Sequence, residues 1–518
     1  MAPAAPDSVQ LRPGALDLAA LHGFWQGPRA AALVPEAWPA IEAAAEAVAA
    51  VLRDGRTVYG VNTGFGRLAK TRIETAQVGE LQHRLLLSHC AGTGPALPAR
   101  VVRLTLLLKI NALARGHSGL RRVTLEALLA LLAADALPVV PAQGSVGASG
   151  DLAPLAHLAA PLIGAGQVML EGERLPAAKA LAKIGLEPLQ LAAKEGLALI
   201  NGTQVSTALL LDALFRGLDL FAAGLVAGAM SVDAALGSDV PFDARLHALR
   251  GQPGQERVAS ELRRLLEGSA IRASHLDCDR VQDPYSLRCQ PQVMGALLDV
   301  LETAAATALR EANAVSDNPL VFPDTGEVLS GGNFHAEPVA LAADMAATAM
   351  AEIGAIAERR LALLTDAALS SLPPFLAEEP GLNSGFMVAH VTAAALASEN
   401  KSLAHPASVD SLPTSANQED HVSMATYAAR RLGPIADNVA GILAIELLAA
   451  AQGLDFRKPL ESSPILREAQ ARLRQEAPGR GTDRPFDAEI EAVRALIDGG
   501  WFTDLIWPDE GARPLLGA

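Results

Sequence analysis

Long segments rich in Ala and Leu, two residues with high helix propensity, place the strongest constraint on the fold of this chain. Residues 206–235 are largely apolar and carry few charges, which predicts a helix buried in a bundle. Residues 337–366 predict a second long helix, and residues 435–452 predict a third with Gly453 as its C-cap. Because a chain of 518 residues can bury a large core, we expect a bundle of long helices at the centre of the fold.

Shorter patterns indicate one further helix and two hairpins. Leucines at positions 125, 128, 129 and 132 share one helical face, and the prolines that follow end the helix. Residues 168–175 predict a hairpin that turns at Glu171 and Gly172, and residues 320–329 predict another that turns at 324–326. Strand patterns are otherwise few and short.

The predicted fold class is therefore mainly α, with a central bundle of long helices and a loop-rich N-terminal region. We expect three regions along the chain: residues 1–195, residues 196–460 with the long helices, and residues 461–518 as a C-terminal helical tail. Segments rich in Gly, Asn and Gln interrupt the helices, and functional side chains are commonly held in such loops by a rigid scaffold.

Charge and cysteine content exclude several classes of function. A net charge of -15 argues against nucleic acid as a partner, because phosphate binding needs basic surfaces. The three cysteines have no CxxC spacing, so they indicate neither a disulfide framework nor a zinc site. The N-terminus lacks the pattern of a signal peptide, and prolines and glycines interrupt the uncharged stretch 152–170. We expect a cytoplasmic protein without membrane partners.

The segment from Gly144 to Leu152 carries the most specific chemistry. Its glycines allow a tight bend in which the amide nitrogen of Gly150 reaches the carbonyl carbon of Ala148. Closure of that ring and dehydration of Ser149 give a methylidene-imidazolone, an electrophile that no side chain supplies. An Ala-Ser-Gly tripeptide on its own is more simply explained as a glycine-rich turn. A phosphate-binding loop is a third interpretation, but no Gly-Lys-Ser/Thr follows this segment. Asp151 either assists ring formation or caps the next helix.

The surrounding sequence decides between these alternatives. Gly144–His157 resembles the cofactor segment of the aromatic amino-acid ammonia-lyases, and further blocks of similarity follow in the same order. These blocks are residues 59–66, 87–89, 201–204, 282–288, 331–335 and 417–421. The resemblance implies a 4-methylidene-imidazol-5-one formed autocatalytically from Ala148, Ser149 and Gly150, with no external organic cofactor. We assign no metal ligands, and the sequence leaves open whether a divalent metal assists. It also implies a homotetramer whose active sites each draw on more than one subunit.

Two tyrosines match active-site positions of that family. Tyr59 is our first candidate for the base that removes the β-proton, and Tyr285 is its competitor. An ordinary tyrosine has a pKa of about 10 and needs nearby cations or donors to act as a base at neutral pH. The sequence does not rank the two firmly.

Four other residues match family positions around the substrate. Arg288 matches the residue that binds the substrate carboxylate, a role that suits a planar guanidinium. Asn201 and Gln282 match amides near the ring and the substrate, and Phe334 matches an aromatic packed close to the ring.

The predicted substrate depends on His89 and Glu419. Both match the form found in family members that act on histidine, and their side chains can bind the two nitrogens of an imidazole. A phenyl group would leave both unpaired, at a cost of about 1–3 kcal/mol each. The resemblance thus implies elimination of ammonia from L-histidine to give trans-urocanate, the first step of histidine degradation.

Three alternatives stay open at this point. A phenylalanine or tyrosine ammonia-lyase, or an aminomutase, would use the same ring. Residues 64–69 fit GxGxxA but lack a βαβ context for dinucleotide binding. A non-catalytic helical scaffold is the third, and the intact Ser149, Tyr59 and Arg288 argue against it.

Overall fold

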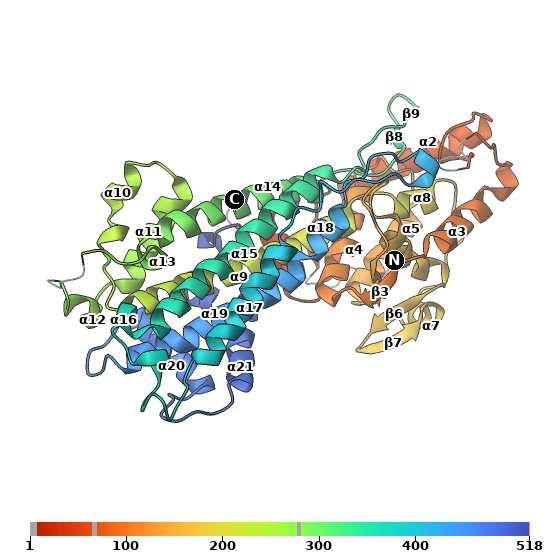
Figure 1. Cartoon of the computed structure of the whole chain (residues 1–518). Coiled ribbons are helices and arrows are strands. Elements are labelled where there is room, and N and C mark those ends of the chain that lie inside the picture. Colours follow the sequence, from red (N-terminus) through yellow and green to blue (C-terminus); the bar gives the residue numbers. More distant parts are fainter. Residues whose placement is uncertain (1–7, 65–69, 277–280, 517–518) are drawn as a thin grey trace. The chain divides into compact units, whose positions relative to one another are not determined.

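A computed structural model describes residues 8–64, 70–276 and 281–516 (Figure 1). Helices make up 60% of the structure and strands 7%, which confirms the mainly α fold class. The chain divides into two compact units. Unit 1 comprises Met1–Asp212, Ala305–Asp344 and Pro406–Arg430, and unit 2 comprises Ala213–Ala304, Met345–His405 and Arg431–Ala518. Each unit combines segments that are distant in the sequence, and the three contiguous regions expected above stay a prediction.

Unit 1 holds all the strands of the described chain and many short helices. Its elements are β1 (Val9–Leu11), α1 (Leu18–Gln26), β2 (Ala31–Leu33), α2 (Trp38–Arg53), α3 (Val78–His89), β3 (Thr93–Ala96), α4 (Ala99–Leu113), α5 (Arg122–Ala133), β4 (Leu137–Pro138), β5 (Pro141–Gln143), α6 (Leu152–Ala159), β6 (Gln167–Leu170), β7 (Glu173–Pro176), α7 (Ala177–Lys183), α8 (Glu195–Ile200), β8 (Leu320–Phe322), β9 (Glu327–Leu329) and α18 (Ala425–Arg430).

Three long helices contribute residues to both units: α9 (Gln204–Ala234), α14 (Gln290–Ala312) and α15 (Glu337–Thr365). The other helices of unit 2 are α10 (Ala244–Ala248), α11 (Pro253–Leu266), α12 (Ala270–Ala273), α13 (Tyr285–Arg288), α16 (Ala367–Ser370), α17 (Met387–Leu403), α19 (Leu432–Asp455), α20 (Pro464–Glu476), α21 (Asp487–Asp498) and α22 (Trp501–Ile506). Short 3-10 turns are η1 (Pro35–Ala37), η3 (Thr75–Gln77), η4 (Ala160–Ile163), η5 (Val240–Phe242), η6 (Pro374–Leu376), η7 (Ser415–Asn417) and η8 (Glu510–Ala512).

The structure confirms the predicted long helices and corrects some of their boundaries. Helix α5 covers the predicted leucine face and α19 covers residues 435–452, while α9 and α15 each end one residue before the predicted segment does. The predicted C-cap at Gly453 is wrong, because α19 continues to Asp455 and its C-cap is Phe456. A Cβ at position 453 would lie 2.8 Å from the Cβ of Ala234, so the glycine permits close packing of α19 on α9.

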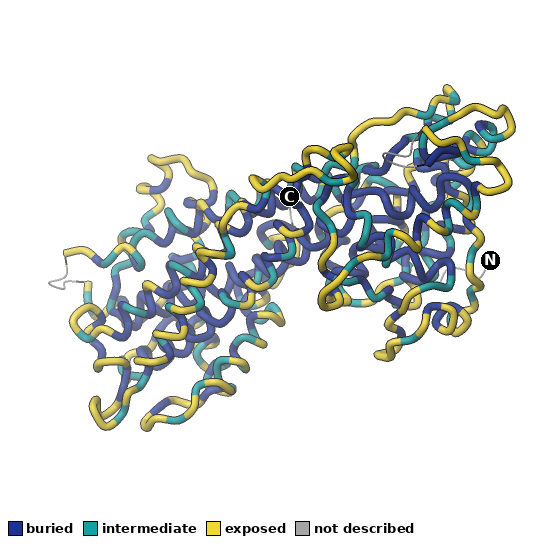
Figure 2. Tube along the Cα trace, turned by 45° about the vertical axis from the view of Figure 1, so that its right-hand side comes forward, coloured by how far each residue is buried: buried dark blue, intermediate teal, exposed yellow. Residues whose placement is uncertain are grey.

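Burial explains the apolar composition of these helices. Gln290–Ala312, Glu337–Thr365 and Ala425–Asp455 are long and apolar enough to cross a membrane by length and composition alone. In their most apolar windows, 44%, 67% and 83% of the residues are buried inside the protein (Figure 2). Most of the apolar stretch that begins at Leu152 is likewise buried, in α6 and η4.

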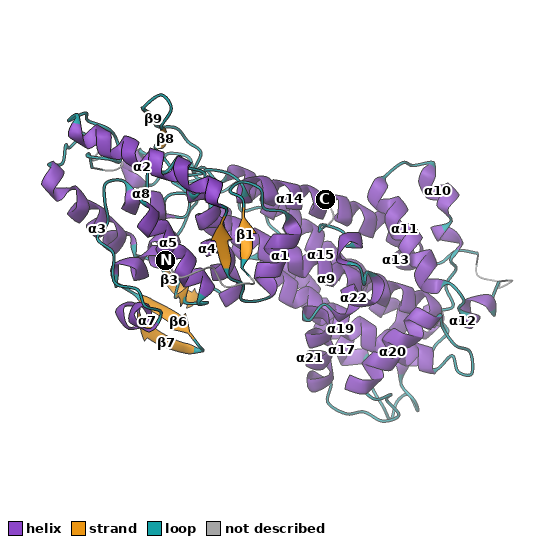
Figure 3. Ribbon diagram, turned by 180° about the vertical axis from the view of Figure 1, so that it is seen from behind, coloured by secondary structure: helices purple, strands orange, loops and turns teal. Residues whose placement is uncertain are grey.

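The strands form four small sheets, all within unit 1 (Figure 3). Strands β6 and β7 pair as the predicted hairpin, with Glu171 at φ 52° and Gly172 at φ 79° in the turn. Strands β8 and β9 form the second predicted hairpin. Strands β1 and β2 pair in parallel, β3 pairs with β5, and β4 adds to β6, so the glycine-rich segment follows directly after a paired strand.

Candidate active site

The glycine-rich segment lies between β5 and α6 and requires its glycines. Gly144, Gly147 and Gly150 have φ values of 134°, 67° and 71°, which L side chains rarely adopt. A Cβ at Gly150 would lie 2.1 Å from the carbonyl oxygen of Gly202. The amide of Asp151 donates to that same oxygen at 2.8 Å. The Ala-Ser-Gly tripeptide is thus held against the turn between α8 and α9.

Ser149 has two contacts at its side chain and backbone. Its Oγ donates to Glu419 Oε1 at 2.6 Å, and its carbonyl oxygen accepts from Asn201 Nδ2 at 2.7 Å. Asn201 Oδ1 is buried and has no hydrogen-bond partner among the described residues. The Nδ2 bond fits a methylidene-imidazolone, because that ring keeps the Ser149 carbonyl oxygen as an acceptor and has no N–H of its own. The buried Oδ1 therefore needs a donor from elsewhere.

Asp151 does not cap the following helix with its side chain. It occupies the N-cap position of α6 but makes no capping hydrogen bond there. Its carboxylate instead accepts from the Ser145 and Thr426 hydroxyls and from the amide and hydroxyl of Ser206, in the first turn of α9. Burial raises the pKa of Asp151, and these hydrogen bonds oppose the rise. The capping alternative is therefore wrong, and assistance in ring formation stays a prediction.

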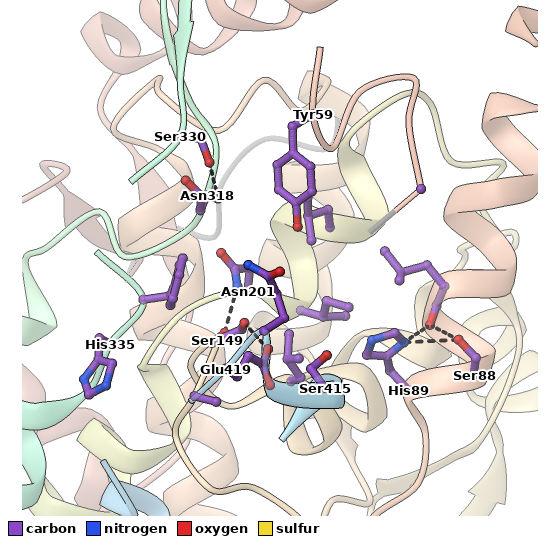
Figure 4. Close-up of a pocket in the computed structure, with 18 of the residues that line it drawn as sticks. Tyr59, Ser88, His89, Ser149, Asn201, Asn318, Ser330, His335, Ser415 and Glu419 are labelled. Atoms are coloured by element: carbon purple, nitrogen blue, oxygen red, sulfur yellow. Dashed lines mark hydrogen bonds between the residues drawn. The ribbon is translucent and has the colours of Figure 1, made fainter. Parts of the chain in front are cut away.

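A cavity of about 1170 Å³ within unit 1 opens over Ser149 (Figure 4). Seven of the predicted site residues line it, and they come from six separate segments of the chain: Tyr59, His89, Ala148, Ser149, Asn201, Phe334 and Glu419. The structure therefore brings together most of the residues that the sequence blocks identified.

The tautomer of neutral His89 follows from its neighbours. His89 Nδ1 lies 2.9 Å from the carbonyl oxygen of Leu85 and 3.1 Å from the Ser88 hydroxyl. Because a carbonyl only accepts, Nδ1 carries the proton and Nε2 presents a lone pair. Burial lowers the pKa of His89, while the Leu85 hydrogen bond and the charge of Glu419 act against the shift. At neutral pH His89 is an uncharged acceptor.

Glu419 is held by a short backbone bridge. Thr414 and Glu419 exchange two backbone hydrogen bonds, at 2.8 and 3.3 Å. The Thr414 hydroxyl donates to Glu419 Oε2 at 2.7 Å, while Oε1 faces Ser149. The carboxylate is thus fixed between the loop that carries it and the tripeptide.

Several lining residues were not predicted, among them Lys70, Arg84, Asn318, Ser330, His335, Ser415, Gln418, Asp420 and His421. The sequence blocks contain His335, Gln418, Asp420 and His421, so the pattern that located Phe334 and Glu419 could have identified them. Lys70 and Arg84 add positive charge to the lining, although Arg84 pairs with Glu80 at 2.6 Å.

One group of side chains in the described chain has the composition of a metal site. Ligand atoms of His335, Glu337 and His421 lie within 4.8 Å of one another. His335 turns Nε2 to His421 Nδ1, at 3.5 Å, and Nδ1 to Glu337 Oε2, at 4.0 Å. One ion cannot use both nitrogens of a single imidazole, so these two contacts do not together form a coordination sphere. The expectation of no metal ligands stays a prediction.

Gln282, Tyr285 and Arg288 belong to unit 2 and do not line this cavity. Tyr285 is 71% exposed, and the Arg288 guanidinium lies over its ring at 4.5 Å. Arg288 also donates to the carbonyl oxygen of Asp283 and to Gln282 Oε1. Gln282 and Tyr285 are exposed, whereas Arg288 is half-buried. Residues 65–69 of the GxGxxA pattern lie outside the described residues.

Comparison with known proteins assigns the fold and the chemistry. A family model described as aromatic amino acid lyase matches residues 16–475. Histidine ammonia-lyase of Burkholderia pseudomallei is 62% identical over 489 residues, covering 94% of this chain and 96% of that protein. Histidine ammonia-lyase of Aromatoleum aromaticum is 61% identical over 495 residues, covering 96% and 94%.

Solved structures agree with that assignment. The crystal structure of histidine ammonia-lyase from Trypanosoma cruzi has a TM-score of 0.90 at 40% identity and covers 98% of this chain and 97% of that one. Tyrosine aminomutase from Streptomyces globisporus has a TM-score of 0.91 at 34% identity, covering 96% and 98%. The chain belongs to the aromatic amino acid lyase family. It is an enzyme that breaks a carbon–nitrogen bond.

Proposed function

We propose that this enzyme eliminates ammonia from L-histidine without oxidation and releases trans-urocanate, the first step of histidine degradation. The observation that carries the proposal is the pair of acceptors in the cavity wall, neutral His89 Nε2 and the carboxylate of Glu419. A neutral imidazole donates one N–H to such an acceptor and an imidazolium donates two, whereas a phenyl ring offers none. Each unsatisfied partner would cost about 1–3 kcal/mol, which disfavours phenylalanine.

Ala148, Ser149 and Gly150 are the residues that would form the methylidene-imidazolone, and the glycine bend and the bond from Asn201 Nδ2 to the Ser149 carbonyl oxygen fit it. Once formed, the ring supplies an electrophile for covalent catalysis of a reaction whose leaving group is a poor one. Dehydration of Ser149 removes the hydroxyl that Glu419 Oε1 now accepts from. That oxygen is then available to an N–H of the substrate.

The remaining roles fall to the two tyrosines and to a guanidinium and an amide of unit 2. Tyr59 lines the cavity and is our candidate for the base, and Tyr285 remains its competitor. We assign the substrate carboxylate to Arg288, with Gln282 beside it. These residues lie in unit 2 outside the cavity lining, and we propose that another subunit of a homotetramer supplies them to the site. We also propose that the enzyme is cytoplasmic, as its three cysteines and acidic charge suggest.

The test is product formation from L-histidine, L-phenylalanine and L-tyrosine, each given separately to the purified protein and followed by ultraviolet absorbance. We expect urocanate and ammonia from histidine alone. Ser149→Ala should retain the fold by circular dichroism and lose nearly all activity, because it cannot form the ring. Cinnamate, coumarate or a β-amino acid as the main product would refute the assigned substrate, and a fully active Ser149→Ala would refute the mechanism.

A further inference from the structure

Helix α4 carries a buried lysine directly behind the loop that holds Ser149. Every residue of α4 from Val101 to Leu113 is buried, and Lys109 is 1% exposed. Its Nζ donates to the carbonyl oxygen of Asn201 at 2.7 Å and approaches Gln204 Oε1 at 3.5 Å. The Lys109 side chain therefore contacts the backbone of Asn201, and the Asn201 side chain in turn holds Ser149.

The partners of Lys109 differ from those of the other buried lysine of unit 1. Lys194 Nζ forms an ion pair with Asp317 at 2.9 Å. Among the described residues no carboxylate lies within ion-pair distance of Lys109, and its Nζ contacts two neutral oxygens. Burial lowers the pKa of Lys109 to about 7. A buried ammonium without a paired carboxylate is costly, and an apolar residue would suit this helix better for stability alone.

The hydrogen bond from Lys109 holds the turn between α8 and α9, and this turn makes two further contacts with the segment that carries Ser149. Asn201 Nδ2 donates to the Ser149 carbonyl oxygen at 2.7 Å. The next carbonyl, that of Gly202, accepts from the amide of Asp151 at 2.8 Å. The turn therefore holds residues 149 and 151 on one side and is held by Lys109 on the other. Loss of the anchor would let the turn shift and relax the bend of the tripeptide.

We propose that Lys109 is a positioning residue for ring formation: through the Asn201 carbonyl it holds the turn that keeps Ala148, Ser149 and Gly150 bent for closure. The proposal rests on the proposed function only in requiring that this ring forms. In closure the Gly150 nitrogen bonds to the Ala148 carbonyl carbon, and the Ala148 oxygen leaves as water. Ser149 then loses Oγ and its α-hydrogen as a second water. The chain loses two waters in all, and no oxidant is needed.

The experiment compares Lys109→Met, Lys109→Gln and a control, Arg103→Met, in the full chain. Arg103 is the matched residue because it is a buried cation on the same helix whose partners are Asp135 and the Phe24 carbonyl, away from the turn. The readouts are the mass of the peptide that contains residues 148–150, the thermal unfolding midpoint, and kcat and KM with L-histidine. The mass gives the fraction of chains that have lost two waters.

We expect Lys109→Met to lower both the dehydrated fraction and kcat about tenfold or more, with little change in KM. The loss of one charge-assisted hydrogen bond accounts for a change of this size. Lys109→Gln should fall between Met and the wild type, since its amide donates without a charge. Arg103→Met should lower the unfolding midpoint but leave the dehydrated fraction of folded chains unchanged.

A folded Lys109→Met chain with full dehydration and wild-type kcat would overturn the proposal. So would an equal loss of dehydration in Arg103→Met, which would make the effect one of general packing. If Lys109→Met does not fold, Lys109→Gln decides, and a wild-type dehydrated fraction in that variant contradicts the proposal. A wild-type chain that loses two waters yet makes no urocanate refutes the proposed substrate while leaving this comparison intact.

Discussion

Replacing Glu419 tests the assigned substrate most directly. In the folded chain its Oε2 accepts from the Thr414 hydroxyl, while Oε1 faces Ser149 across 2.6 Å. Loss of the Ser149 hydroxyl on dehydration leaves one carboxylate oxygen in the cavity wall for an imidazole N–H. Two variants separate the charge from the hydrogen bond: Glu419→Gln keeps an acceptor of nearly the same size, and Glu419→Ala removes it.

The magnitudes follow from the kind of hydrogen bond that is lost. A bond to a charged group contributes about 1.5–3 kcal/mol and a neutral one about 0.5–1.5 kcal/mol. Glu419→Gln should therefore cost about 1–1.5 kcal/mol, which lowers kcat/KM for histidine about fivefold to tenfold. Glu419→Ala should cost the whole interaction and lower kcat/KM between about tenfold and 150-fold.

The assay is initial-rate absorbance of urocanate at several histidine concentrations. The dehydrated fraction of residues 148–150, measured by mass, corrects each rate for chains that lack the ring. Asp410→Asn is the matched control, because Asp410 is an exposed acid of the same segment that does not line the cavity. Both variants with wild-type kcat/KM per dehydrated chain would refute the assignment of Glu419 to the imidazole.

Three further predictions concern other contacts. Thr414→Val removes the donor to Glu419 and should lower kcat/KM for histidine about twofold to tenfold in steady-state kinetics. Burial raises the pKa of Asp219 from 3.8 to about 7, so the folded state binds more protons than the unfolded state in that range and loses stability as pH rises through it. Asp219→Asn should therefore show a smaller fall of the unfolding midpoint between pH 5 and pH 8, and an unchanged fall would contradict the shift. Arg360→Met leaves the fully buried Glu446 unpaired and should cost about 3–5 kcal/mol in urea unfolding, whereas Arg360→Met with Glu446→Leu should recover most of it.

Sequence pattern predicted the helices well because the same apolar spacing that makes a buried helical face is visible in the letters. It failed at Gly453, because a glycine at such a position can have either of two structural roles. A glycine near the end of a helical segment is typical of a C-cap, but here it allows close approach to Ala234. The two roles can be distinguished only when the neighbouring helix is known, and a single sequence does not show which helix that is.

The site likewise contains residues that the sequence identified and residues that it missed. Residues with a distinctive local block, such as Ser149 and Glu419, were found and lie in one cavity. Lys109 was missed because it is one of three basic residues in a largely apolar helix, and its role comes from a contact with Asn201, 92 positions away in the sequence. The blocks also give no indication that Arg288 belongs to a different unit from the tripeptide.

Backbone strain around Glu419 indicates that this loop was selected for placement of a side chain rather than for stability. Ser415, Ala416 and Asn417 have φ values of 53°, 53° and 63°, three consecutive non-glycine residues in the left-handed region. Each such residue costs about 1–3 kcal/mol and persists only where the surroundings over-determine it. The bridge between Thr414 and Glu419 closes this turn on itself. The backbone thus accepts a cost of several kcal/mol to direct one carboxylate at Ser149. Lys109, which is buried without a paired carboxylate, likewise accepts a cost where its Nζ holds the carbonyl oxygen of Asn201.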